Sequence, residues 1–586
     1  MNIREYLAMG KPLLFDGAMG TYYASLPGRA EARCELGNIE HPEDIAAIHR
    51  GYLEAGCRAI KTNTFGLGED VAEGRETLAA DIIEAACRIA KDAAADYGAY
   101  IFADIGPAPE GKTLSRGEIC RKQAGLFLQQ GITCFLVETQ SSDEGIPELA
   151  EFIKERCPEA FIIVSFAVGS DGFTRDGQLG KALFRRMAAN SNIDAVGFNC
   201  VSGPSHLLKY IRDIDIGDTL LSVMPNAGYP TVLGRRVVFG GKPDYFAEHL
   251  SKIAQSGAVI VGGCCGTTPE HMAKAAEALK NSAPTIHAEP RRIERSDVSP
   301  KGNPLWDKLS AGKRVIAVEL DPPEDDDISF FMEGVEALRD AGADAVTIAD
   351  CPVGRPRADS SLLACKIKRE LGVEPLPHMT CRDRNLNATR ALLLGLSMED
   401  VHNVLLVTGD PIPTESRDEV KSVFNFNSRK LARYVSGLNE SVLSTPFRVF
   451  GALNLNARNF AMQLKLAREK EECGVSGFLT QPIHSAEALE NLKLARETLK
   501  GKILGGIFPI VSHRNALFLN NEIAGMRVCD EIVSLYEGKK RSASEKLAVE
   551  ISAAVAREIE PYVDGFYLMT PFKRVELMTR IIEAIR

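Results

Sequence analysis

Three cysteines have the residue type and the placement needed for metal chemistry. Cys200 follows the apolar run AVGFN, and the doublet Cys264-Cys265 follows AVIVGG. Thiolates favour zinc, and three protein ligands leave the fourth tetrahedral position open, which is typical of catalytic zinc. A substrate thiol bound there would lose its proton and become a nucleophile at neutral pH. The alternative is three buried structural cysteines, but the doublet and the placement at run ends favour zinc.

The elements that must bring these cysteines together are predicted from a repeated unit. A helix-like stretch ends in a small residue, four to six apolar residues follow, and the run stops at a polar or Gly/Pro tip. Near-continuous apolar strands indicate parallel strands that crossover helices cover on both faces. Eight such units in each half predict an α/β fold of two (βα)8 TIM-type barrels, with the chemistry at the strand tips. The runs are PLLFDGAMG, AIKTNTFG, YIFADIGP, CFLVETQS, AFIIVSFAV, AVGFNC, LLSVMPNAG and AVIVGGCCG, then VIAVELDPP, AVTIADCP, EPLPHMTC, NVLLVTGDP, RVFGALNLN, GFLTQPI, KILGGIFPI and GFYLMTPF.

The boundary between the two barrels is predicted at a stretch without apolar periodicity. Residues 281–304 are rich in Pro, Ser and charge, as interdomain linkers are. We therefore expect a first barrel at residues 1–285, a linker at 286–304 and a second barrel at 305–586. Another polar stretch, which begins at Pro411 after the fourth strand of the second half, is a candidate active-site loop.

Composition and charge exclude several classes of partner. The 586 residues carry 69 Lys and Arg against 79 Asp and Glu, a formal net charge of −10, without a basic run. Nucleic-acid and anionic-membrane surfaces require a clustered positive field, so neither partner is expected. The N-terminal sequence lacks an apolar signal-peptide core, and no apolar run approaches the length of a membrane span. We expect a cytoplasmic protein whose other cysteines are mostly reduced and buried.

Several motifs of the first half together resemble the homocysteine S-methyltransferase family. They are FDGAMGT, KTNTFG, VETQ, GFNC, PNAG and GGCCGTTPEH, in this order. The resemblance implies that Cys200, Cys264 and Cys265 bind Zn²⁺, and that Asp16 and Glu138 hold the homocysteine amino group. It also implies that Asn226 lies near the open metal position, while Asn63 is a weaker candidate for homocysteine binding. Two carboxylates suit an ammonium group, whose charge needs paired anions once it is desolvated. The alternative for these polar tips is that they cap loops.

One motif of the first half is rejected. Residues 106–113, GPAPEGKT, match the phosphate-loop pattern GxxxxGK[ST] and follow a predicted strand. Such a loop points successive backbone N–H groups at phosphates, and Pro107 and Pro109 have none. We therefore interpret the segment as an ordinary barrel loop.

The strand tips of the second half resemble methylenetetrahydrofolate reductase in the order of the motifs VELDPP, HMTC, NVLLVTGDP and GFLTQP. By this resemblance, Glu319 is the general acid that helps to open the methylene bridge of the folate, which then accepts hydride from a reduced flavin, FAD. A carboxyl can do this only if burial raises its pKa toward neutrality. The remaining roles implied are flavin binding by His378, Asp410 and Lys470, and folate binding by Asp410, Gln481 and Arg574.

Each of these roles has a simpler alternative. His378 follows a proline and is compatible with a core histidine, Lys470 belongs to the charged run REKEE, and Gln481 is compatible with a loop cap. The fifth strand also departs from the family, which usually has a Tyr-Pro-Glu tip with a histidine nearby. Here the strand reads GALNLNARN, with Asn454 and Asn456 instead.

The combined expectation is a bifunctional enzyme that methylates homocysteine and reduces 5,10-methylenetetrahydrofolate with NADH or NADPH. No DxHxxG corrinoid motif occurs, so the methyl donor stays open: methyltetrahydrofolate, a sulfonium, or a corrinoid on another protein. One alternative makes the second barrel only a folate-binding or regulatory module. Another makes the chain a docking partner for a separate corrinoid protein. The sequence also leaves open whether the chain forms a homo-oligomer.

Overall fold

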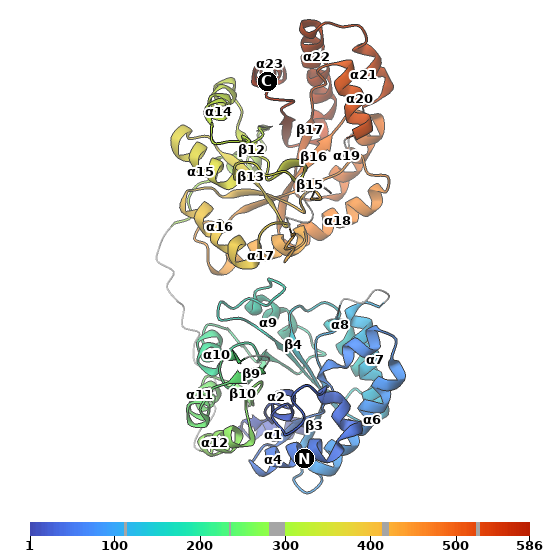
Figure 1. Cartoon of the computed structure of the whole chain (residues 1–586), viewed down its shortest axis with the longest axis vertical. Coiled ribbons are helices and arrows are strands. Elements are labelled where there is room, and N and C mark those ends of the chain that lie inside the picture. The colour runs from blue at the N-terminus through green and yellow to red at the C-terminus, as the bar shows by residue number, and fades with distance from the viewer. Residues whose placement is uncertain (110–113, 234–235, 281–298, 413–420, 523–527) are drawn as a thin grey trace. The chain divides into compact units, whose positions relative to one another are not determined.

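The computed structural model describes the chain except for residues 110–113, 234–235, 281–298, 413–420 and 523–527. Two compact units are formed by Met1–Arg295 and Ser296–Arg586 (Figure 1). Most of the predicted linker therefore lies outside the described residues. In both units, helices lie on the outside of a parallel sheet.

The first unit contains the eight predicted parallel strands. They pair in the order β1-β10-β7-β6-β5-β4-β3-β2, and a bridge between Phe15 and Ala59 joins β1 to β2. The prediction of a first TIM-type barrel is thereby confirmed. The strands are β1 (Leu13–Leu14), β2 (Ala59–Lys61), β3 (Tyr100–Ile105), β4 (Cys134–Gln140), β5 (Phe161–Phe166), β6 (Ala195–Asn199), β7 (Leu220–Met224) and β10 (Ala258–Val261).

The helices of the first unit follow the strands and cover the barrel. Helix α6, for example, directs a stripe of Ala and Ile residues to the sheet, because apolar residues recur at helical spacing. The elements are α1 (Ile3–Ala8), α2 (Gly20–Tyr23), η1 (Cys34–Leu36), α3 (Gly37–Glu40), α4 (Pro42–Glu54), η2 (Phe65–Leu67), α5 (Gly68–Ala72), α6 (Glu76–Ala94), α7 (Arg116–Gln129), α8 (Ile146–Arg156), α9 (Gly180–Ala188), α10 (Pro204–Ile211), α11 (Pro243–Gln255) and α12 (Pro269–Leu279).

A short antiparallel hairpin was not predicted from the sequence. Strands β8 (Pro230–Leu233) and β9 (Arg236–Phe239) pair with each other between β7 and α11. The hairpin is part of the connection that follows β7 at the carboxyl end of the barrel. The Cys264-Cys265 doublet follows β10 at the same end.

The second unit is a closed barrel whose eight strands pair in chain order, which confirms the second predicted barrel. They are β11 (Val315–Glu319), β12 (Ala345–Ile348), β13 (Pro375–Thr380), β14 (Asn403–Val407), β15 (Arg448–Leu453), β16 (Val475–Pro482), β17 (Lys502–Ile507) and β18 (Gly565–Met569). The helices are α13 (Pro304–Ser310), α14 (Ser329–Ala341), η3 (Pro352–Gly354), α15 (Ser360–Leu371), α16 (Leu386–Met398), α17 (Ser428–Ser441), α18 (Phe460–Glu472), α19 (Ala486–Thr498), α20 (His513–Glu522), α21 (Asp530–Leu535), α22 (Arg541–Ile559), η5 (Glu560–Tyr562) and α23 (Val575–Ile585).

Each barrel interior is packed, and a helix ahead of its first strand contributes to it. Ile3 of α1 belongs to the lumen core of the first barrel with Phe15 and Phe102, while Leu305 and Leu309 of α13 belong to that of the second. Because both interiors are filled with side chains, space for a ligand is expected only at the carboxyl ends of the strands.

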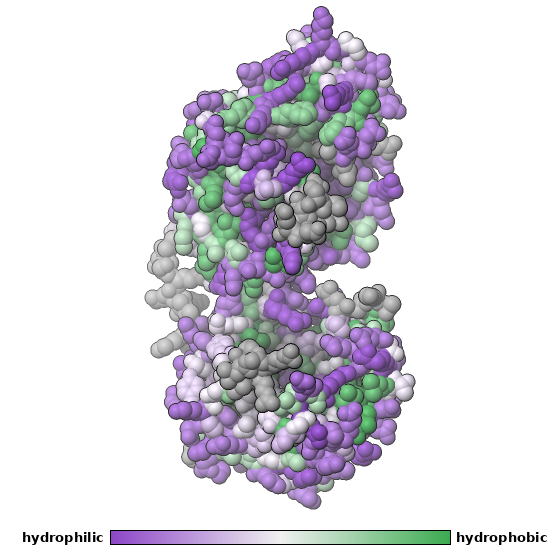
Figure 2. All heavy atoms as spheres, viewed as in Figure 1, coloured by the Kyte–Doolittle hydropathy of each residue, from purple (hydrophilic) through white to green (hydrophobic). Residues whose placement is uncertain are grey.

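Hydrophilic side chains dominate the face seen in Figure 2, and hydrophobic ones occur there in scattered groups. Among the helices of the described residues, none has the length and apolar character required to cross a bilayer.

Candidate active sites

Three sulfurs meet at the carboxyl end of the first barrel. Cys200 directly follows β6 with a left-handed backbone (φ +58°), and Cys264 and Cys265 follow β10. The three Sγ atoms lie within 4.8 Å of one another, and those of Cys200 and Cys265 are 3.7 Å apart. Zinc–sulfur bonds of about 2.3 Å in a tetrahedron separate the sulfurs by about 3.8 Å, so the cluster fits a zinc ion.

The environment of the cluster raises the pKa values of its thiols. The hydrogen bond with Cys264 lowers the pKa of Cys200, whereas the hydrogen bond with Cys265 and burial raise it. The net result is an increase of this pKa to about 12. The hydrogen bond with Cys200, together with burial, holds the pKa of Cys264 well above its usual range. Without a metal the cluster therefore stays protonated at neutral pH, and metal binding must release protons.

The sulfurs line a cavity of about 260 Å³. Part of its wall is the loop after β1, which contains Ala18. The Ala18 N–H donates to Thr267 Oγ1 at 3.0 Å and so joins this loop to the loop that carries Cys264 and Cys265. A Cβ at Gly17 would lie 2.6 Å from Thr267 Oγ1, so this approach requires glycine. The lining residues are Gly17, Ala18, Met19, Gly20, Thr21, Cys34, Glu35, Lys61, Asn63, Phe65, Asp104, Glu138, Thr139, Cys200, Cys264 and Cys265.

Glu138 points into this cavity from an irregularity of β4. The register with β5 shifts between Val137 and Gln140, and Thr139 has a φ of +60°. Such bulges re-aim a side chain at the end of a strand. Asn199, the last residue of β6, lies with its Nδ2 3.0 Å from Glu138 Oε2 and 3.9 Å from Cys264 Sγ. Asn199, which the sequence contains in the motif GFNC, was not predicted as a site residue.

Asp16 does not line the cavity itself but directly precedes the lining residue Gly17, and it has a partner that sequence reasoning missed. Lys61 at the end of β2 places its Nζ 2.7 Å from Asp16 Oδ1, and its backbone N–H donates to Asp16 Oδ2 at 2.9 Å. The two side chains are 6% and 1% exposed, respectively. Burial raises the pKa of Asp16, and the Lys61 ammonium opposes that increase. The charge of Asp16 is thus compensated within the protein.

The two predicted asparagines differ in position. Asn63 lines the cavity, yet its Nδ2 donates to the Cys34 carbonyl at 2.7 Å, so its amide holds the 34–38 segment. Asn226 is buried in the loop after β7, which supports the cysteine doublet: the Cys264 N–H donates to the Pro225 carbonyl at 2.9 Å. The Oδ1 of Asn226 has no hydrogen-bond partner among the described residues.

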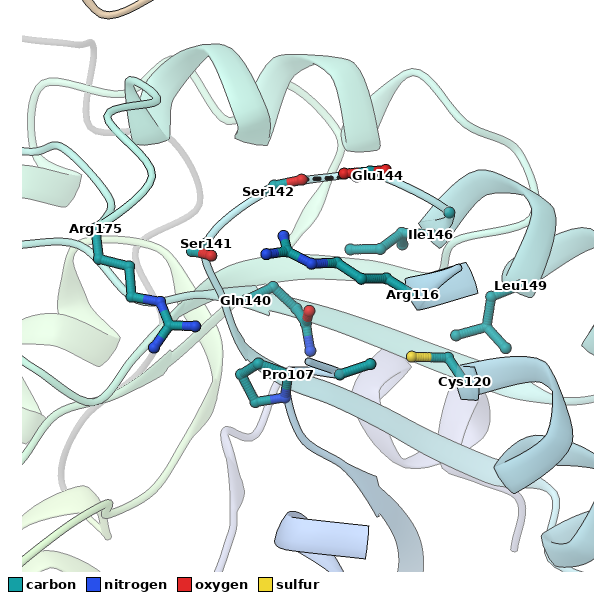
Figure 3. Close-up of a pocket in the computed structure, with 12 residues that line it drawn as sticks. Pro107, Arg116, Cys120, Gln140, Ser141, Ser142, Glu144, Ile146, Leu149 and Arg175 are labelled. Atoms are coloured by element: carbon teal, nitrogen blue, oxygen red, sulfur yellow. Dashed lines mark hydrogen bonds between the residues drawn. The ribbon is translucent and has the colours of Figure 1, made fainter. Parts of the chain in front are cut away.

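A smaller cavity lies beside this site, behind Gln140 and Ser141 (Figure 3). Pro107 of the rejected phosphate-loop motif borders it, although residues 110–113 of that motif are outside the described chain. Arg116 at its edge is paired with Asp176 at 3.2 Å. The cavity measures about 10 Å³, which is room for roughly one water molecule. It does not offer space for a nucleotide.

In the second barrel, Glu319 ends β11 and meets a tyrosine from the neighbouring strand β18. The Tyr567 hydroxyl donates a hydrogen bond to Glu319 Oε2, and His378 Nε2 lies 3.7 Å from the same oxygen. The side chain of Glu319 keeps 23% exposure, yet the surrounding protein desolvates its carboxyl and raises its pKa to about 7. Burial lowers the pKa of His378 to about 4, so this imidazole is neutral beside Glu319 at pH 7.

Asp410 and Lys470 have defined partners. Asp410 is exposed after β14, and its Oδ2 accepts a hydrogen bond from the Val353 N–H at 2.8 Å. Its carbonyl accepts one from the buried Arg382 at 2.6 Å, a contact that the sequence did not predict. Lys470 is not simply solvated, because its Nζ donates to the Ala452 carbonyl at 2.9 Å and burial lowers its pKa.

The remaining predicted residues lie at the ends of strands or helices. Gln481 occupies an irregularity of β16, where the register with β17 shifts between Leu479 and Pro482. Arg574 caps α23 and pairs with Glu545 at 3.0 Å. At the atypical fifth strand, Asn454 Oδ1 accepts the Asn456 N–H and Asn456 Nδ2 donates to the Pro482 carbonyl, at 2.9 and 3.0 Å. These asparagines thus tie the tips of β15 and β16 together.

Two barrels with acid, thiol and carboxylate groups at the carboxyl ends of their strands define the chain as a TIM-barrel enzyme with two sites. Residues 13–279 match the family model of homocysteine S-methyltransferase, and residues 305–586 match that of methylenetetrahydrofolate reductase. The chain therefore belongs to the homocysteine S-methyltransferase family in its first half and to the methylenetetrahydrofolate reductase family in its second.

The individual relatives reported below each match a little under half of this chain. The methionine synthases of Mycobacterium tuberculosis and Mycobacterium leprae are 30% and 31% identical over 45% and 47% of this chain. The chain covers only 24% and 25% of the length of these relatives. The homocysteine methyltransferase MmuM from Escherichia coli, in its metallated and oxidized forms, is 22% and 23% identical with a TM-score of 0.39. These two matches span 47% and 46% of this chain and 99% and 97% of the MmuM chains.

Proposed function

We propose that the chain is a bifunctional enzyme of one-carbon metabolism. The first barrel transfers a methyl group to the thiol of homocysteine, giving methionine. The second uses NADH or NADPH and FAD to reduce 5,10-methylenetetrahydrofolate to 5-methyltetrahydrofolate. One observation carries the proposal: three cysteine sulfurs from two strand ends converge on a cavity that also contains buried carboxyl groups.

In the first barrel, Cys200, Cys264 and Cys265 would hold Zn²⁺, which supplies the acidity that converts a bound substrate thiol into a thiolate. The other residues bind and orient the substrate. Glu138 offers a carboxyl for its ammonium group, and Asn199 fixes that carboxyl relative to Cys264. Glu138 is buried, which strengthens these charge interactions.

In the second barrel, Glu319 is the proposed proton donor to the folate. With a pKa of about 7, it is protonated in a large fraction of molecules at neutral pH. Tyr567 holds its carboxyl in place, and Glu319 lies at the carboxyl end of β11 with part of its side chain exposed. Gln481 and Arg574 are the proposed folate contacts, together with Asp410.

The flavin part of the proposal is supported by polar atoms of the second barrel that have no hydrogen-bond partner among the described residues. His378 Nε2 and Thr570 Oγ1 are buried and have no hydrogen-bond partner among the described residues. A polar ring system would satisfy such atoms. His378, Asp410 and Lys470 would hold FAD, which supplies the hydride.

The test is methionine formation by the purified chain from homocysteine, methylenetetrahydrofolate and NAD(P)H, without a corrinoid. Methionine would support both activities and direct use of methyltetrahydrofolate. Accumulation of methyltetrahydrofolate without methionine would support the reductase and assign another methyl donor, such as a sulfonium or a separate corrinoid protein, to the first barrel. Absence of NAD(P)H–menadione oxidase activity would favour a second barrel that only binds folate. Absence of both zinc and flavin from the purified protein would refute the proposal.

A further inference from the structure

A strained turn follows β12 at the carboxyl end of the second barrel. Cys351, Val353 and Gly354 have φ values of +49°, +55° and +70°, and only the last of them is a glycine. A left-handed conformation is uncommon for other residues and is an outlier for a β-branched residue such as valine. Backbone strain of this kind persists only where the surrounding structure holds it, and it is concentrated at functional sites. The contacts of the turn therefore indicate what it does.

The tip of the turn is held by a carboxylate from another part of the barrel rim. The Val353 N–H donates to Asp410 Oδ2 at 2.8 Å, and Asp410 follows β14. The side chain of Val353 does not explain the conformation by packing, because the residue is 68% exposed. The hydrogen bond with Asp410 therefore ties the tip of the turn to the end of β14.

The same hydrogen bond orients the Asp410 side chain, which is exposed. Arg382 donates to the Asp410 carbonyl at 2.6 Å and thereby fixes the backbone. Asp410 Oδ2 accepts the Val353 N–H, whereas Oδ1 has no hydrogen-bond partner among the described residues. The terminal torsion of an aspartate is broad, so a donor that holds one oxygen also decides where the other oxygen points. Oδ1 is therefore held in a defined direction and is available to a ligand.

The far end of the connection after β12 is anchored beside the proposed proton donor. The Ala358 N–H donates to the Pro323 carbonyl at 3.0 Å. Pro323 belongs to the loop that follows β11, the strand that ends in Glu319. A single connection thus contacts both the loop after Glu319 and the side chain of Asp410.

Strand β13, which lies between β12 and β14, is joined to the same connection. Asp350 is buried just after β12, and its Oδ2 accepts the Thr380 N–H at 2.9 Å. The same oxygen accepts a hydrogen bond from Arg384 at 2.7 Å. The ends of four consecutive strands, β11 to β14, are therefore linked, and the strained turn provides the link to Asp410.

We propose that the turn at residues 351–354 positions the Asp410 carboxylate, through the Val353 N–H, to contact the folate that reacts at Glu319. This inference rests on the proposed reductase function and deepens it. Val353 is thus a positioning residue that acts through its backbone N–H, and its side chain has no part in the contact. The left-handed conformation is what directs this N–H to Asp410.

The test is a double-mutant cycle on the full-length, flavin-loaded protein, with 5-methyltetrahydrofolate binding measured by equilibrium dialysis. Val353→Pro removes the donor, and Asp410→Ala removes the acceptor. Each should weaken binding by ~10-fold, as expected for one hydrogen bond of a charged group. The double variant should bind no more weakly than Asp410→Ala alone, because Val353 acts only through Asp410. The conservative variant Val353→Gly keeps the N–H in a residue suited to positive φ, so it should retain binding.

Hydrogen exchange at the turn tests the same contact without a change at Val353. In Asp410→Ala, amide exchange of a peptide that covers residues 351–355 should accelerate by ~10-fold, because the acceptor of the Val353 N–H is gone. Asp400→Gly removes a carboxylate before the other end of β14 and should leave this exchange at the wild-type rate.

Circular dichroism and flavin content are measured on every variant. The inference is overturned if Val353→Pro binds 5-methyltetrahydrofolate like the wild type, or if the two effects multiply in the double variant. Unchanged exchange of the turn in Asp410→Ala also overturns it, even if Val353→Pro does not fold. A wild type that binds no 5-methyltetrahydrofolate would refute the proposed reductase function and this inference with it, which differs from a wild type that binds while the variants bind equally well.

Discussion

The side-chain amide of Asn199 lies 3.0 Å from the Glu138 carboxylate and joins it to the metal-binding end of the first barrel. Replacing Asn199 by alanine removes this donor. We expect the KM for homocysteine to rise ~10-fold, corresponding to one lost hydrogen bond to a charged group. Zinc stoichiometry should be retained, because the three sulfurs are unchanged. Steady-state kinetics with metal analysis checks this, and a normal KM would show that Glu138 needs no such support.

Metal binding by the cysteine cluster should be visible as proton release. The pKa of Cys200 is raised to about 12, so the thiols of the metal-free protein are protonated at pH 8. Addition of Zn²⁺ to this form should release roughly three protons per ion.

Cys264→Ser should abolish zinc retention and methionine formation and leave flavin reduction by NAD(P)H intact. Cys87→Ala, which alters a buried cysteine of α6, is the control that should retain both zinc and the proton release. Loss of both activities in Cys264→Ser would mean that the barrels are not independent.

The reduction of folate should depend on pH through Glu319. Its pKa of about 7 means that the protonated acid predominates below pH 7 and is lost as the pH rises through that value. The folate half-reaction, measured by rapid mixing of reduced enzyme with methylenetetrahydrofolate, should slow accordingly above pH 7. Glu319→Gln should lose this step and retain flavin reduction by NAD(P)H. Persistent folate reduction in this variant would assign the acid to another residue.

Tyr567 provides a finer test of the same site. Its hydroxyl donates to the Glu319 carboxylate and stabilises the charged form, which lowers the pKa of Glu319 against the effect of burial. Tyr567→Phe removes that donor, so the pKa of Glu319 should rise and the pH profile of the folate half-reaction should move to higher pH. A purely structural role of Tyr567 would reduce the rate at all pH values without moving the profile.

The sequence predicted the barrels better than it predicted the sites. Strands such as AFIIVSF are apolar on both faces, which identifies parallel strands directly. Lys61, by contrast, is a lysine at a strand tip, a residue type that is usually solvated, and only the closed barrel brings it to Asp16. Tyr567 appears in the sequence as one more aromatic residue of a buried strand, and its hydroxyl contact depends on the pairing of β18 with β11. The β8–β9 hairpin escaped prediction because its apolar run lies between two strands already assigned to the barrel.

The Lys61–Asp16 pair should also contribute to the stability of the first barrel. Both side chains are buried, so Lys61→Met leaves an unpaired carboxylate and should lower the free energy of unfolding by ~3–5 kcal/mol. Protonation of Asp16 would relieve the defect. Its folded-state pKa in this variant is raised above the unfolded value, so stability should be greater at low pH and lost as the pH rises. The double variant Lys61→Met/Asp16→Asn removes both charges and should regain most of the loss.

Urea unfolding of the full chain followed by two signals measures this effect. Circular dichroism reports both barrels, whereas the fluorescence of Trp306, the single tryptophan, reports only the second barrel, where it packs against Phe450. In Lys61→Met, the urea midpoint followed by circular dichroism should fall below the wild-type value. The midpoint followed by Trp306 fluorescence should stay at the wild-type value. Equal shifts in both would show that the two barrels unfold together, and no shift in either would show that Asp16 finds another partner.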